Sequence, residues 1–155
     1  DAAEVDSEIC FQKPFDNMIE VEKTYSISSE ETEEENTYLS YNKVIATSLD
    51  EKLYQAFQIL DYALLSAPGA PLKKALMDAG IGKDIMGSYD NGIYQPIFSI
   101  IAKNTEPQQK EQFVQVIEDT LRKIVEESIG KRWKRELIIM SSGLGKRISE
   151  ITRKV

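Results

Sequence analysis

A cluster of proline and glycine between two helix-like segments is the feature that most constrains the fold of this chain. The apolar positions before it recur at helical spacing: Leu53, Phe57, Leu60 and Leu64. This helix is expected to reach about Ser66 and to end at Pro68 and Pro71, because proline lacks a backbone N–H and disfavours helical geometry in the residue before it. Pro71 also suits the first turn of a new helix, which Gly80 and Gly82 would stop in the left-handed region. The segment therefore predicts a long helix, a tight corner and a short helix.

Two segments have the composition of strands. Residues 37–46 are rich in aromatic and β-branched side chains and alternate in part. Residues 93–103 follow a turn at 90–92 and alternate more clearly, with Pro96 near the start, where a missing donor is harmless. One face of this second strand is apolar throughout: Phe98, Ile100 and Ala102.

The helices are expected to begin at capping boxes. Ser48 can accept the amide of Glu51 while Glu51 reaches back, and residues 105–108 would start the last helix in the same manner. The apolar stripe of that helix, which ends near Gly130, is Phe113, Val116, Ile117, Leu121, Ile124 and Val125. The element order predicts an α+β fold, with helices on one face of a mostly antiparallel sheet.

The 155-residue chain contains no histidine. It therefore lacks the commonest general base and the commonest zinc ligand, and it cannot activate a serine or cysteine nucleophile through imidazole. The spacings of a calcium loop, a P-loop and a dinucleotide-binding loop are also missing from the sequence. We expect no catalytic, cofactor-binding or metal-binding residue in this chain.

Charge divides the chain into three regions. Residues 1–35 lack a steady period and end in five glutamates among residues 28–35, which we interpret as an extended connector and acidic linker from an upstream domain. Residues 36–130 would form the α+β domain. Residues 131–155 form a basic segment of uncertain structure: eight Lys and Arg against two Glu give 130–155 a charge of +6, and leave −13 for the rest. The acidic body disfavours nucleic acid as a partner, although the glutamate run could attract basic peptides.

Other candidate residues have simpler explanations. Cys10 has no activating base in the chain, and a lone cysteine fits a reducing, cytoplasmic compartment. Tyr38 and Tyr41 either pack on the sheet or line a binding wall, and Trp133 anchors a helix end more readily than it stacks on a base. The sequence has no apolar stretch of membrane-spanning length, so no membrane partner is expected. Capping and solvation account for the scattered aspartates, which are Asp61, Asp78, Asp84 and Asp90.

The ordered features between residues 36 and 128 resemble the insulinase/pitrilysin-type zinc metallopeptidases, in particular the presequence-protease-like branch. The resemblance rests on four runs: Ser48-Leu49-Asp50 through Leu65, Ala67-Pro68-Gly69-Ala70-Pro71-Leu72, Ala79-Gly80-Ile81-Gly82, and Tyr94-Gln95-Pro96-Ile97-Phe98. It implies an incomplete domain of the mitochondrial-processing-peptidase-like metallohydrolase fold. Such domains build two halves around a peptide chamber.

The family holds zinc through an inverted His-x-x-Glu-His motif on a helix of its first domain. This chain cannot contain that motif, and the comparable helix offers Gln55, Gln58, Asp61 and Tyr62, which form no ligand set. The resemblance therefore implies a non-catalytic, second domain, with zinc expected in an upstream catalytic domain of a longer protein. Its partners would be the other domains of that peptidase and unfolded peptide substrates. A stand-alone α+β interaction module without peptidase activity is the alternative.

Overall fold

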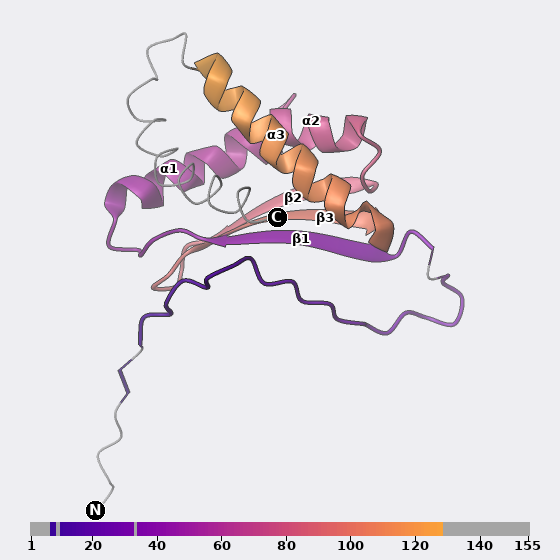
Figure 1. The fold of residues 1–155 in the computed structure, drawn as a ribbon, viewed down its shortest axis with the longest axis horizontal. Coiled ribbons are helices and arrows are strands. Elements are labelled where there is room, and N and C mark those ends of the chain that lie inside the picture. The colour runs from indigo at the N-terminus through magenta and orange to yellow at the C-terminus, as the bar shows by residue number, and fades with distance from the viewer. Residues whose placement is uncertain (1–6, 9, 33, 129–155) are drawn as a thin grey trace, which may run out of the picture.

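The computed structural model describes residues 7–8, 10–32 and 34–128, which form a three-stranded sheet with helices on one face (Figure 1). The order is β1 (Thr37–Val44), α1 (Glu51–Asp61), the π-helical turn η1 (Tyr62–Ser66), α2 (Pro71–Asp78), β2 (Asp84–Asp90), β3 (Ile97–Thr105), the 3₁₀ turn η2 (Pro107–Gln109) and α3 (Lys110–Ser128). The predicted α+β class with an antiparallel sheet and helices on one face is confirmed. The predicted segment 131–155 lies outside the described residues.

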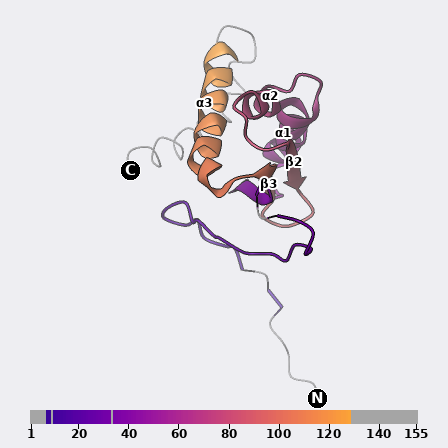
Figure 2. The same cartoon turned by 90° about the vertical axis from the view of Figure 1, so that its right-hand side faces the viewer.

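The sheet has the order β1-β3-β2, and both pairings are antiparallel. Ser99 at its centre faces Asn42 on β1 and Ser88 on β2, so these three residues lie at one level across the sheet. Figure 2 shows the helices above the sheet and the N-terminal connector below it. The two faces of the sheet therefore meet different surroundings.

The proline corner forms as the sequence predicts. The helix of α1 continues as η1 to Ser66, and the Ala67 amide donates to the Tyr62 carbonyl at 2.7 Å. Pro71 is in the first turn of α2, whose four-residue repeat begins with Lys74 donating to the Ala70 carbonyl at 2.9 Å. The corner thus ends one helical segment at Ser66 and starts the next at Pro71.

Gly82 shows why the stop after α2 needs glycine. Its φ of 66° lies in the left-handed region, and an added Cβ would fall 2.5 Å from the Lys103 carbonyl oxygen. Gly80 also has a positive φ, as predicted. The tight stop lets the chain enter β2 directly.

Several predicted boundaries differ from the structure. The cap of α1 is Asp50, whose Oδ1 accepts the Leu53 amide at 3.1 Å, and not Ser48, whose amide donates to the Tyr94 carbonyl. The second strand begins at Ile97 rather than at residue 93. Strand β2 was not predicted at all, and it forms because its backbone pairs with β3 along its whole length.

The capping box before the last helix lies one residue later than predicted, at Glu106 and Gln109. Gln109 reaches back to accept the Glu106 amide at 3.0 Å, while the Thr105 hydroxyl is used elsewhere and donates to the Thr37 carbonyl. The predicted stripe of α3 is directed at the sheet, with Phe113 and Ile117 fully buried.

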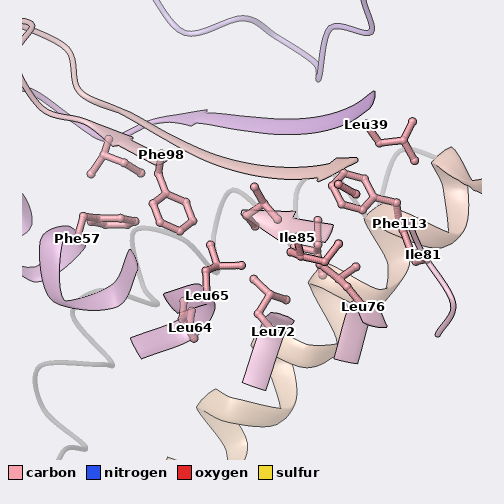
Figure 3. Close-up of a cluster of buried hydrophobic side chains, with 14 residues drawn as sticks. Leu39, Phe57, Leu64, Leu65, Leu72, Leu76, Ile81, Ile85, Phe98 and Phe113 are labelled. Carbon is pink, nitrogen blue, oxygen red and sulfur yellow. The ribbon is translucent and has the colours of Figure 1, made fainter. Parts of the chain in front are cut away.

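The core lies between the sheet and the helices (Figure 3). As predicted, alternate residues of β3 face it. Figure 3 shows side chains from every layer meeting there, among them Leu39, Phe57, Leu65, Leu72, Leu76, Ile81, Ile85, Phe98 and Phe113. Tyr41 is half-buried against this cluster, and burial raises its pKa.

Candidate interaction surface

Helix α1 crosses β2, the strand at one edge of the sheet. The two elements meet through aromatic rings: the Tyr89 centroid lies 5.8 Å from that of Phe57 and 6.3 Å from that of Tyr54. Phe57 in turn packs edge-on against Phe98 of the central strand, at 5.5 Å. These contacts hold β2 under α1 and leave its outer edge without a strand neighbour among the described residues.

Asp61 lies at the end of α1 over Gly87 of β2. A Cβ added at Gly87 would come within 3.0 Å of both Asp61 Oδ1 and Leu65 Cδ1, so only glycine allows this approach. Asp61 Oδ1 is buried and has no hydrogen-bond partner in the structure, and burial raises the pKa of this carboxyl. The Asp61 carboxyl is therefore easier to protonate than an exposed one.

Tyr89 OH is another buried polar atom that has no hydrogen-bond partner among the described residues. Burial raises its pKa, and the neighbouring Tyr54 raises it further. Tyr89 was not predicted from the sequence. The sequence did contain a signal for a strand here. Ile85, Gly87 and Tyr89 occupy alternate positions in a segment that lies between the glycine stop and the turn at 90–92.

The comparable positions of the family's zinc helix do not form a site here. Gln55, Gln58 and Tyr62 are exposed, and Asp61 alone is directed inward. A set with one carboxylate, two amides and a phenol does not fit zinc, which prefers thiolate, imidazole and carboxylate ligands. In the part of the chain that the structure describes, no group of three or more His, Cys, Asp or Glu is placed to hold a metal ion.

The remaining aspartates are surface residues with ordinary partners or positions. Asp78 pairs with Lys74 at 2.6 Å, and Asp84 pairs with Lys73 at 3.2 Å. Asp84 and Asp90 are the end residues of β2, rather than residues of helices or turns. Cys10 is an exposed free thiol.

Tyr38 lies on the sheet face that is opposite the helices. Its ring packs edge-on against Tyr25 of the connector, with centroids 5.6 Å apart, and the Tyr25 hydroxyl donates to the Asn36 carbonyl. Tyr38 and Tyr41 therefore point to opposite sides of β1. The search for a membrane-spanning helix within the described residues found none.

Comparisons with known proteins agree with this architecture. The family model described as "Peptidase M16 inactive domain" matches residues 7–132. Protein HypA of Clostridium perfringens is 44% identical over 128 residues, which are 83% of this chain and 13% of that protein. Presequence protease 1, chloroplastic/mitochondrial, of Arabidopsis thaliana is 28% identical over 123 residues, 78% of this chain and 11% of that protein. The chain thus spans about an eighth or less of these relatives, and it belongs to the M16 peptidase family as an inactive domain.

Proposed function

We propose that this chain is the non-catalytic domain of a zinc-dependent endopeptidase that degrades unfolded peptides. It completes the wall of the peptide chamber and offers the edge of β2 to an extended substrate. Zinc and the catalytic groups belong to another domain of the same polypeptide. The family match and the presequence protease among the relatives favour a peptidase as the complete protein. The absence of histidine from this sequence favours a non-catalytic role for this chain.

The observation that carries the proposal is the free edge of β2. An edge strand presents a row of backbone donors and acceptors that an extended peptide can pair with, and alternate side chains then add selectivity. The other edge strand, β1, has the connector packed on its outer face through the ring contact of Tyr25 with Tyr38. Among the described residues the connector makes no ring contact with β2, so β2 is the edge we assign to the peptide.

The peptidase assignment is tested with the complete polypeptide and a quenched unfolded peptide. We expect cleavage that a chelator abolishes and added zinc restores, while residues 1–155 alone give none. Cleavage by the isolated chain would contradict its non-catalytic role. An inactive complete polypeptide would favour the stand-alone interaction module.

The β2 edge is tested by photo-crosslinking from two matched positions. Ser88→Cys and Asn42→Cys each carry a benzophenone label in the complete polypeptide, in a Cys10→Ser background with other reactive cysteines removed. Both residues are exposed and both face Ser99, but from opposite edges of the sheet. We expect an unfolded peptide to crosslink at position 88 several times more than at position 42. Equal yields would exclude the β2 assignment.

A further inference from the structure

The connector carries a concentration of exposed apolar side chains. Six of the fourteen large apolar side chains that are exposed in the described chain fall within residues 11–25. They are Phe11, Phe15, Met18, Ile19, Val21 and Tyr25. Soluble proteins rarely expose this many large apolar side chains within one short segment, so the segment indicates a contact.

The connector is held to the domain at a few separate points. Gln12 and Gln95 exchange two hydrogen bonds, of 2.8 and 3.0 Å, and Glu20 pairs with Lys110 at 2.7 Å. Between these points the chain runs across the sheet face opposite the helices, antiparallel to β1 (Figures 1 and 2). These polar contacts place the connector without covering its apolar side chains.

Two further exposed apolar side chains, Ile93 and Tyr94, lie on the hairpin that joins β2 to β3. They precede Gln95, whose hydrogen bonds with Gln12 tie this hairpin to the connector. Residues 11–25 contain only two Lys, one Asp and two Glu, so their net charge is −1. A nearly neutral, apolar surface is better suited to pack against another protein surface than to bind a basic peptide or a lipid headgroup.

We infer that this surface, residues 11–25 with Ile93 and Tyr94, docks against another domain of the same polypeptide. The inference rests on the proposed function for the existence of that domain. Two observations select the occupant. The relatives are roughly eight to nine times longer than their matched regions, and the family match begins at residue 7, so it includes the apolar segment 11–25.

The test compares methionine oxidation by hydrogen peroxide in residues 1–155 and in the complete polypeptide. Met18 on the connector and Met77 on α2 form a matched pair, because their side chains are 47% and 42% exposed in the chain alone. We expect Met18 to oxidise at least tenfold more slowly in the complete polypeptide, and Met77 to change less than twofold. Equal rates for Met18 in the two proteins, or equal slowing of both methionines, would overturn the inference.

A variant links the protection to the apolar side chains. Phe15→Ser combined with Ile19→Ser should restore fast oxidation of Met18 in the complete polypeptide. The isolated chain should keep its melting temperature, because both side chains are exposed there. Leu49→Ser is the control, since Leu49 is exposed outside the surface and its change should leave Met18 protected. Protection that survives the double variant would overturn the inference.

Two other occupants give different results. If residues 1–155 form a dimer by sedimentation and Met18 is slow in that dimer, the occupant is a second copy. If an added unfolded peptide slows Met18 in the isolated chain, the occupant is substrate. Either result overturns the inference. Because oxidation does not depend on activity, a complete polypeptide that protects Met18 but cleaves no peptide would contradict the proposed function alone.

Discussion

The two faces of the three-stranded sheet have the same backbone and very different surroundings. On the helix side, Ile100 and Ala102 of β3 are essentially fully buried. On the other side, the neighbouring Ile101 is only half-buried, and Val44 and Tyr38 of β1 are about half exposed. Helices close the first face, whereas the second face meets, within the described part of the chain, a connector held at separate points.

This difference separates the origin of stability from the origin of contacts. Burial of apolar surface is the dominant favourable term in folding, so the helix face should determine whether the domain folds. The outer face contributes less to folding of the chain alone and has apolar side chains left for other partners. Substitutions that are matched across the two faces should therefore have unequal effects.

The largest contrast is expected between Ile100 and its neighbour Ile101. Ile100→Ala should lower the free energy of unfolding by about 2–4 kcal/mol, because the removed atoms leave a cavity in a closed core. Ile101→Ala should lower it by about 1 kcal/mol or less, since Ile101 is part-exposed. Urea denaturation followed by circular dichroism measures both. Similar losses would mean that the outer face is as well packed as the helix face.

The helix face was the more predictable of the two. The alternation of Phe98, Ile100 and Ala102 and the fixed φ of Pro71 are local properties, and the structure confirms what they predict. The family resemblance predicted from ordered local features is confirmed as well. Such patterns can be interpreted from the sequence because each residue type fits one local environment.

Strand β2 and the cap of α1 were not predictable in the same way. β2 contains Gly87 and has an aspartate at each end, residues with low strand propensity, and it depends on pairing with β3. Ser48 looks like a cap, but its amide is drawn to Tyr94, a residue 46 positions away. The Asp61–Gly87 approach likewise joins two distant elements. The domain boundary at residue 36 and the division of the chain into three regions stay predictions.

Gly87 gives the next largest effect. Gly87→Ala should destabilise the domain by about 1–3 kcal/mol, because the new Cβ overlaps Asp61 Oδ1 and Leu65 Cδ1. Gly92→Ala is the control, since its nearest atom lies 3.9 Å from the added Cβ, and it should change stability by less than about 0.5 kcal/mol. Thermal or urea unfolding of both variants tests this. A neutral Gly87→Ala would mean that α1 moves freely over β2.

The Asp61 side chain should lower the stability of the domain at neutral pH. One oxygen of its carboxylate, Oδ1, is buried without a hydrogen-bond partner among the described residues, so Asp61→Asn should raise the free energy of unfolding by about 1 kcal/mol at pH 7. Burial raises the folded pKa above its ordinary value of 3.8, so the folded state binds the proton more tightly. The stabilisation that the bound proton provides is therefore complete below about pH 3.8, and it is lost as the pH rises through the raised pKa of Asp61.

The pH dependence of Asp61→Asn distinguishes this cause from a packing effect. The gain over the parent should shrink as pH falls from 7 towards 4, and urea denaturation at several pH values measures it. Asp78→Asn is the matched control: Asp78 is exposed and paired with Lys74, so it should lose about 0.2–0.5 kcal/mol instead. A gain at Asp61 that is constant with pH would refute the electrostatic explanation.

The smallest effect on stability is expected where the connector meets the domain. Glu20→Gln removes the ion pair with Lys110, which joins two exposed side chains and raises the Lys110 pKa through its hydrogen bond. Exposed pairs contribute little, so the melting temperature should shift by less than about 1 °C. Trypsin cleavage after Lys23 should nevertheless become faster, because the connector separates from the domain more often. Lys110→Gln removes the same pair from the other side and should act alike. The ion pair lies outside the core. A clear decrease of the melting temperature in both variants would therefore show that the outer face also stabilises the fold, and it would contradict the contrast between the two faces.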